Sequence, residues 1–115
     1  MKMKHITIHT DKLEESVGFY SEVLGLSVQT DMRKTAGMPI VFLSNGEGET
    51  AIELIEEETS YEGRGISIGF EVQDVDAKRS ELDAAGYSPS PMISPNPHVK
   101  FFFIEDPNGV KIQII

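Results

Sequence analysis

The sequence predicts an α+β fold in which one βαβββ module is built twice. Segments with alternating apolar residues, typical of strands, surround two segments whose apolar residues recur at helical spacing. The same order of elements returns in the second half. At 115 residues and 39% hydrophobic content, the chain is long enough for one compact domain and too short for two ordinary ones. We therefore expect a single domain over 1–115, with modules over about 1–60 and about 61–115.

The first module opens with HITIHT, a strand whose alternation puts its two isoleucines on one face. From Leu13 the apolar spacing becomes helical, with Asp11 and Glu14 as a capping box and Gly25 as the end of the helix. The turn SNGEGE separates the last two strand candidates of this module. The expected strands are Leu26–Arg33, Pro39–Ser44 and Thr50–Glu56.

The second module repeats this order. ISIGFEV, from Ile66, predicts a strand, and DVDAKRSELDAAG predicts a helix with Asp74 as its N-cap and Gly86 at its end. Val75 and Leu82 are expected to face inward. The remaining expected strands are Tyr87–Ile93, Val99–Ile104 and the closing VKIQII, which follows the turn EDPNG.

The chain also matches itself in register. HITI from His5 falls on SIGF from Ser67 at an offset of 62 residues. The glycines that end the helices match at an offset of 61, and IELI from Ile52 falls on IQII from Ile112 at 60. A drift of two residues is what one short difference in loop length would produce. A duplicated module explains this pattern.

Two such modules, each with a helix on one face of its sheet, leave the opposite faces free to curve around a pseudo-twofold axis into a cleft. The polar side chains expected there do not suit a closed core, because burying each one unpaired would cost about 1–3 kcal/mol. The expected cleft residues are His5, Thr7, His9, Ala51, Glu53, Ile55, Ser67, Gly69, Glu71, Lys111, Gln113 and Ile115.

Composition excludes several classes of function. The absence of cysteine rules out disulfides, thiolate metal sites and a cysteine nucleophile. A net charge of −9 disfavours binding to nucleic acid or to anionic lipid. No apolar run reaches the roughly 18 residues of a membrane span, and the first residues lack the apolar stretch of a signal peptide. We expect a cytoplasmic protein that does not bind membranes.

Four stretches carry a resemblance to a known family: HITIHTDKLEESVGFYSEVLGL, AIELIE, GFEVQDVDA and EDPNGVKIQII. Together they resemble the vicinal oxygen chelate superfamily, which includes glyoxalase I, bleomycin-resistance proteins, fosfomycin-modifying enzymes and extradiol dioxygenases. The resemblance covers nearly the whole chain and implies the glyoxalase/bleomycin-resistance fold. It also implies a homodimer. These stretches are specific for the fold and not for one activity.

The resemblance implies a metal-ligand quartet at His5, Glu53, Ser67 and Gln113. Metal-using relatives most often carry histidine where Ser67 stands and glutamate where Gln113 stands. Imidazole and carboxylate are good ligands, an amide is weaker and a hydroxyl is poorer still. An open catalytic zinc site usually keeps three protein ligands, so the set is one short unless Gln113, His9 or Glu71 contributes. The same two positions argue against a dioxygenase, which needs two histidines and a carboxylate.

Glyoxalase-type isomerisation requires a base, which the resemblance places on the last strand. Gln113 cannot serve, because an amide is not basic at neutral pH. Glu53 is the candidate catalytic residue, and His9 is a second candidate. Lying between two apolar residues, Glu53 needs a partner, which can be a cation, a ligand, or a donor such as His5, Ser67 or Gln113. For His5 the alternatives are metal ligation and a single hydrogen bond in the cleft wall.

A further set of residues is expected to contact a ligand. Aromatic residues on the second module's strands can line a pocket, and Arg33 can attract an anionic group. His98, between a proline-rich loop and an apolar strand, has no predicted role. The candidate ligand-binding residues are His9, Arg33, Ser67, Glu71, Met92, Phe101 and Phe103.

Two functions remain open. The first is a protein resembling bleomycin-resistance proteins that binds a small, partly apolar molecule in the cleft without an obligatory metal. The second is a glyoxalase I-type lyase or isomerase that uses one divalent metal (Ni, Co, Zn, Mn or Fe), held by His5 and Glu53 with Gln113 as an auxiliary ligand. The incomplete quartet favours the first, and the retained pair keeps the second open.

Overall fold

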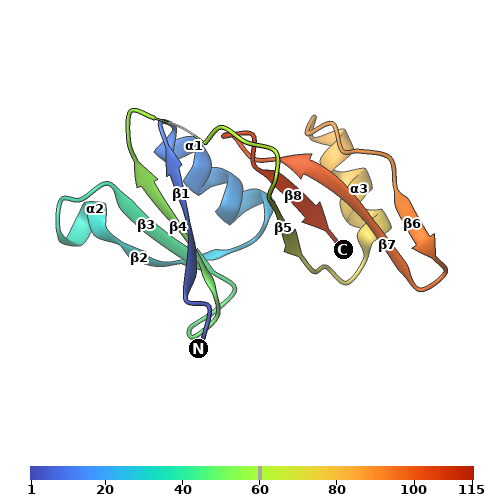
Figure 1. The fold of residues 1–115 in the computed structure, drawn as a ribbon, viewed down its shortest axis with the longest axis horizontal. Helices are drawn as coiled ribbons and strands as arrows, with labels where there is room; N and C mark the ends of the chain where they lie inside the picture. The colour runs from blue at the N-terminus through green and yellow to red at the C-terminus, as the bar shows by residue number, and fades with distance from the viewer. Residues whose placement is uncertain (60) are drawn as a thin grey trace. The chain divides into compact units, whose positions relative to one another are not determined.

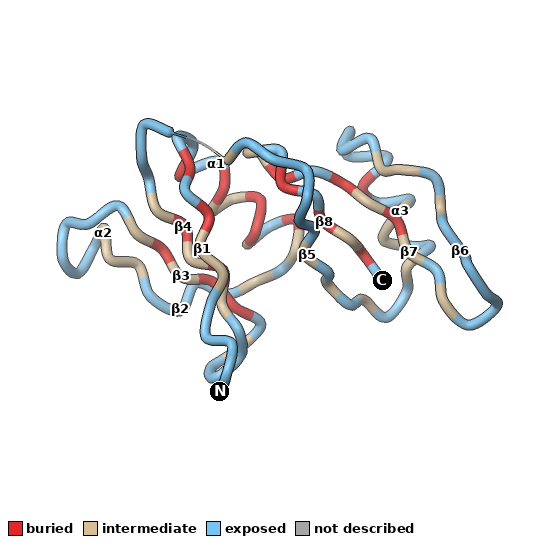
Figure 2. Tube along the Cα trace, in the orientation of Figure 1, coloured by how far each residue is buried: buried red, intermediate tan, exposed pale blue. Residues whose placement is uncertain are grey.

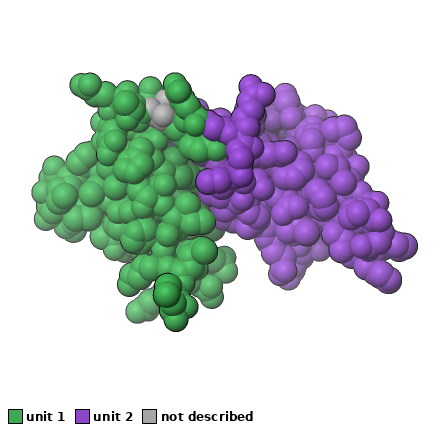
Figure 3. Space-filling view, in the orientation of Figure 1, with its two compact units in different colours: residues 1–62 green, residues 63–115 purple. Residues whose placement is uncertain are grey.

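The computed structural model describes residues 1–59 and 61–115. The chain divides into two compact units, Met1–Glu62 and Gly63–Ile115, which Figure 3 colours separately. Each unit contains a four-stranded sheet and a helix (Figure 1), which confirms the predicted α+β fold with two βαβββ modules. Within the described residues, no helix is both long and apolar enough to cross a membrane.

Unit 1 has the strand order β1-β4-β3-β2. β1 and β4 are parallel, whereas the other neighbouring strands are antiparallel. Helix α1 contacts β4 and covers one face of the sheet (Figure 1). The elements are β1 (His5–Thr10), α1 (Leu13–Gly18), the π-helical turn η1 (Phe19–Val23), β2 (Ser27–Asp31), α2 (Met32–Thr35), β3 (Ile40–Ser44) and β4 (Ala51–Glu56).

Helix α1 begins differently from the prediction. The capping box predicted at Asp11 and Glu14 is wrong, since the N-cap residue is Lys12 and, within the described residues, no side-chain hydrogen bond caps the helix. The hydroxyl of Thr10 accepts a hydrogen bond from the backbone N–H of Lys12 at 2.9 Å. The acceptor at the start of the helix is therefore Thr10 and not its neighbour Asp11. The predicted end at Gly25 is confirmed by its φ of 72°, a conformation that favours glycine.

Unit 2 repeats the topology with the order β5-β8-β7-β6, in which β5 and β8 are parallel. The predicted N-cap is confirmed, because the Asp74 side chain accepts the backbone N–H of Ala77 at 2.9 Å. Gly86 ends the helical region with a φ of 87°. The elements are β5 (Ser67–Phe70), α3 (Val75–Ala84), β6 (Ile93–Asn96), β7 (Val99–Glu105) and β8 (Lys111–Ile114).

Two expected strands differ in extent. The strand predicted over Tyr87–Ile93 is wrong, because β6 begins only at Ile93. Pro89 and Pro91 lack the N–H donors of a strand ladder, and Ser90 between them bonds Phe103 through both its backbone N–H and its hydroxyl. In unit 1, the strand predicted over 26–33 ends at residue 31, where the short helix α2 follows.

The core of each unit lies between its helix and one face of its sheet (Figure 2). In unit 1 the buried apolar residues are Ile8, Leu13, Phe19, Tyr20, Val23, Val41, Leu43, Ile52 and Leu54. In unit 2 they are Leu82, Phe102, Ile104, Val110, Ile112 and Ile114. Because side chains alternate along a strand, the residues between these core positions point to the other side of each sheet, which we call its open face.

Candidate functional site

The open face of unit 1 carries a polar cluster centred on Glu53. Strands β1 and β4 place Thr7 beside Glu53, and the Thr7 hydroxyl donates a hydrogen bond of 2.5 Å to Glu53 Oε1. Nε2 of His5 lies 3.4 Å from the same oxygen. The Glu53 side chain is only 13% exposed, whereas that of His5 is 37% exposed. The prediction that Glu53 needs a partner is met within its own unit, by Thr7 and His5.

This cluster supplies few donors for a metal ion. His5 and Glu53 are the two good ligands, and the neighbouring Thr7 offers only a neutral hydroxyl. Over residues 1–59 and 61–115, no three His, Cys, Asp or Glu side chains gather closely enough to hold a cation. The donor set of unit 1 therefore does not by itself fit a resident catalytic metal, which usually has three protein ligands.

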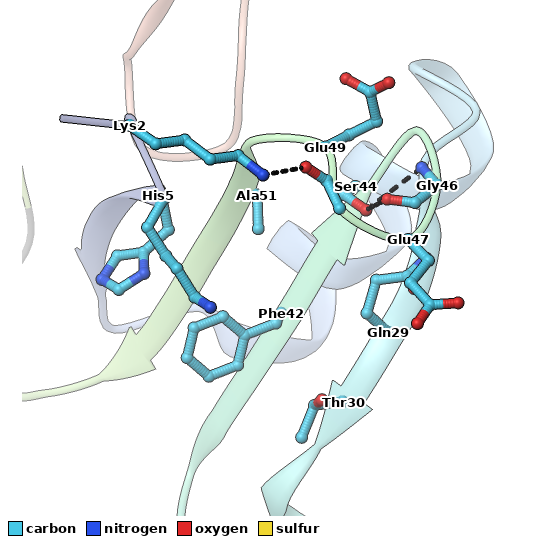
Figure 4. A pocket seen from close by; sticks show the side chains of 12 residues that line it. Lys2, His5, Gln29, Thr30, Phe42, Ser44, Gly46, Glu47, Glu49 and Ala51 are labelled. Carbon is cyan, nitrogen blue, oxygen red and sulfur yellow. Dashed lines mark hydrogen bonds between the residues drawn. The ribbon is translucent and has the colours of Figure 1, made fainter.

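An open pocket of about 540 Å³ adjoins the cluster (Figure 4). His5 and Phe42 lie side by side there, with ring centroids 5.6 Å apart and nearly perpendicular planes. Lys2 reaches over the turn between β3 and β4 and donates to the carbonyl of Gly48 at 2.7 Å. The pocket is lined by Lys2, Lys4, His5, Gln29, Thr30, Phe42, Ser44, Gly46, Glu47, Gly48, Glu49 and Ala51. It thus combines an aromatic wall with charged groups near its edge.

His9 lies farther along β1, on the same face as His5. Its Nδ1 is 2.9 Å from Oε1 of Glu57, just beyond β4, and both side chains are about half exposed. Because a solvent-exposed ion pair is worth little, this contact holds the His9 side chain only weakly.

The open face of unit 2 has a different character. Gln113 on β8 lies between Gly69 on β5 and Phe103 on β7. A Cβ atom at Gly69 would stand 3.1 Å from Oε1 of Gln113, so the missing side chain provides the space in which this amide lies. Phe103 packs edge-to-face against Phe101 at 5.7 Å, and the ammonium of Lys111 lies 4.1 Å from the centre of the Phe103 ring.

The structure also places the other predicted residues of unit 2. Ser67 lies on β5 at the position that corresponds to His5, and it is exposed. Glu71 is exposed just beyond β5, and Met92 is half-buried just before β6. His98 lies in the exposed turn between β6 and β7, where its backbone N–H donates to the side chain of Asn96.

Arg33, expected to attract an anionic ligand, pairs with carboxylates of its own unit. Its guanidinium contacts Asp31 at 2.8 and 2.9 Å and Glu14 at 2.6 Å. The side-chain hydrogen bonds from Arg33 lower the pKa of Asp31, and the same contacts raise the pKa of Arg33. The positive charge of Arg33 is therefore largely compensated by the protein.

The sequence places Thr7, Gly69 and Lys111 in the expected cleft without indicating a role for them, and Phe42 is not among the predicted site residues. The signal for Thr7 and Gly69 was present in the self-match, because Thr7 aligns with Gly69 and Glu53 aligns with Gln113, and each pair is a cross-strand pair in its own sheet. The contact of Lys111 with Phe103 depends on which rotamer a long side chain adopts. A sequence pattern does not specify that rotamer.

Known proteins are similar to this chain in sequence and in fold. A family model described as "Glyoxalase/Bleomycin resistance protein/Dioxygenase superfamily" matches residues 2–114. The "uncharacterized protein YwbC" of Bacillus subtilis (strain 168) is 30% identical, and the match covers 97% of this chain and 94% of that protein.

Solved structures show the same similarity. A possible glyoxalase from Bacillus cereus is 19% identical with a TM-score of 0.78, covering 100% of this chain and 98% of that one. TnmS3, an antibiotic-binding protein from Streptomyces sp. CB03234, is 19% identical with a TM-score of 0.78, and the match covers 99% of this chain and 93% of TnmS3. The trypanothione-dependent glyoxalase I of Leishmania major is 25% identical with a TM-score of 0.75, and the match covers 100% of this chain and 86% of that one. The resemblance to the vicinal oxygen chelate superfamily is thus confirmed, and the chain belongs to the Glyoxalase/Bleomycin resistance protein/Dioxygenase superfamily.

Proposed function

We propose that the protein binds a small, partly apolar molecule on the open faces of its sheets and that a metal is not obligatory. The observation that carries this proposal is the pocket of about 540 Å³ in which His5 and Phe42 lie side by side. Small-molecule sites typically combine such aromatic surface with a few polar groups that orient the ligand.

The state of Glu53 supports the same proposal. A half-buried carboxylate needs a partner, and the Thr7 hydroxyl and His5 already provide one. Glu53 therefore requires no cation to be stable in the fold. It remains available to accept a hydrogen bond from a ligand that enters beside His5.

The family description fits a binding role. It names bleomycin resistance proteins beside the enzymes, and the antibiotic-binding protein TnmS3 has the same fold. In this family, therefore, small-molecule binding and catalysis occur on one scaffold, and the residues of each chain decide between them.

The proposal is tested by ligand binding to EDTA-treated protein. Bleomycin and a panel of aromatic and aliphatic small molecules would be screened by thermal shift, and the hits titrated by calorimetry. We expect saturable binding by metal-free wild type, because a ligand that binds only the folded state raises the melting temperature. Phe42→Leu, which removes the ring and keeps an apolar side chain, should weaken binding. Met38→Ala, an exposed apolar position outside the pocket lining, is the matched control.

Failure of every panel member to bind metal-free wild type would contradict the proposal. Equal weakening by Phe42→Leu and Met38→Ala would show that binding does not use this pocket.

A second candidate function is a glyoxalase I-type lyase, favoured by the 3.4 Å approach of His5 Nε2 to Glu53 Oε1. His5 and Glu53 stand at positions that hold a divalent ion in such enzymes, and the glyoxalase I of Leishmania major is 25% identical. Glu53 would be the base, and Gln113 an auxiliary ligand.

An assay of S-lactoylglutathione formation from methylglyoxal and glutathione, with added Ni, Co, Zn, Mn or Fe, tests this candidate. Turnover that is lost in Glu53→Gln would support it, since glutamine cannot accept the proton. The binding proposal predicts no turnover with any of these metals.

A further inference from the structure

We propose that the open face of unit 2 binds the carboxylate end of a flat aromatic acid, with Lys111 and Gln113 as its hydrogen-bond donors and Phe103 as its ring contact. This inference rests on the proposed function and extends it, because it names the chemical class of ligand that an open face takes. It follows from three features of β5, β7 and β8.

The first feature is the ammonium group of Lys111, which has no ion-pair partner within residues 1–59 and 61–115. Glu105 is the cross-strand neighbour of Lys111, yet within the described part of the chain Lys111 forms no ion pair. Its Nζ lies instead 4.1 Å from the centre of the Phe103 ring. In a protein of net charge −9, such a cation on an aromatic face is a local site of attraction for an anion.

The second feature is the amide of Gln113. This residue is half-buried, and its side chain has no hydrogen-bond partner among residues 1–59 and 61–115. Glu53, its counterpart in unit 1, bonds Thr7, but Gly69 occupies the position that corresponds to Thr7. The amide therefore keeps a donor and an acceptor for a ligand. A hydrogen bond from a ligand would offset the free-energy cost of leaving this half-buried group unpaired.

The third feature is the aromatic surface beside these donors. Phe101 and Phe103 are half-buried and meet edge-to-face, with ring centroids 5.7 Å apart and an interplanar angle of 79°. Aromatic rings prefer such edge-to-face or offset contacts, so a third, flat ring can pack against this pair.

The register brings the three features together. Lys111 and Gln113 are two residues apart on one face of β8, and Phe103 contacts Lys111 and lies directly across from Gln113. A single carboxylate beside the Phe103 ring can accept hydrogen bonds from both donors while its own ring packs on the two phenylalanines. Charge-assisted bonds of this kind are stronger than neutral ones.

The test compares 2-naphthoate with its neutral analogue 2-naphthalenemethanol by calorimetry on the full chain. We expect wild type to bind the acid more tightly than the alcohol. Lys111→Met should weaken binding of the acid by about tenfold and leave binding of the alcohol unchanged, because only the acid uses the ammonium. Gln113→Leu should weaken binding of the acid by a smaller factor than Lys111→Met does.

Lys100→Met is the matched control, since it removes the same charge from the same unit. Lys100 pairs with Asp76 at the start of α3, on the helix side of the sheet. Equal binding of 2-naphthoate by wild type and Lys111→Met, or equal losses in Lys111→Met and Lys100→Met, would overturn the inference. So would a wild type that binds the alcohol as tightly as the acid or that binds no naphthoate. Any of those results would leave the proposed function standing, provided that other molecules of the thermal-shift panel bind metal-free wild type. The proposed function itself fails only if no panel molecule binds.

Discussion

Glu53 on β4 and Gln113 on β8 occupy corresponding places in the two units, but the residues beside them differ. Thr7 donates to Glu53 across the parallel pair β1 and β4. Gly69, in the corresponding place on β5, offers no side chain and leaves room for the Gln113 amide. One unit thus presents a carboxylate that is already hydrogen-bonded, and the other an amide whose side chain has no hydrogen-bond partner in the described part of the chain.

The Thr7–Glu53 contact gives a prediction for stability. Thr7→Val keeps the shape of the side chain and removes the hydroxyl donor from a half-buried carboxylate. We expect the free energy of unfolding to fall by about 1–2 kcal/mol, the usual result of leaving such a group without its partner. Urea denaturation measures this change. Thr7→Ser keeps the hydroxyl and should lose clearly less, so valine and serine variants of equal stability would contradict the role of the hydrogen bond.

Single elements show where sequence patterns predict structure well and where they do not. Strands β1, β4 and β8 follow their alternating residues closely, because one face of each strand is more deeply buried than the other. Strand β6 was misplaced because Tyr87–Met92 holds two prolines, and tertiary hydrogen bonds to Ser90 replace a ladder there. The short helix α2 was missed because its start depends on the side chain of Asp31 accepting the N–H of Arg33.

The junction of β2 and α2 gives a prediction for pH. The pKa of Asp31 is lowered in the folded protein by hydrogen bonds from Arg33. A carboxyl group with a lowered folded pKa stabilises the fold above its unfolded pKa, here about 3.8, and this contribution is lost as the pH falls through the folded value. Asp31→Asn, which can still cap α2, should therefore have a lower melting temperature than wild type at pH 7. This difference in melting temperature should shrink below about pH 3.8.

Thermal melts of both proteins between pH 7 and pH 3 measure this difference. Glu14→Gln is the control, because the Glu14 side chain is 88% exposed and its pair with Arg33 is screened by solvent. A difference between wild type and Asp31→Asn that stays constant down to pH 3 would show that the charge of Asp31 contributes nothing.

For the whole molecule, the sequence predicted the repeated fold because the duplication is visible both in the order of elements and in register. Alternation of side chains predicted that His5 and Glu53 share one face of the sheet, and the family resemblance implied that they come together, as they do at 3.4 Å. The hydrogen bond from Thr7 to Glu53, the pocket beside His5 and the contact of Lys111 with Phe103 were not predicted. These features depend on rotamers and on the path of the turn between β3 and β4.

We propose that His5 and Glu53 form a polar element of a ligand site and that the protein does not require a metal there. Calorimetric titration of metal-stripped wild type and Glu53→Ala with nickel tests this proposal. We predict weak uptake by wild type, below one ion per chain, and the same weak uptake by the variant. Tight, stoichiometric nickel binding by wild type that disappears in Glu53→Ala would contradict the proposal and establish a metal centre.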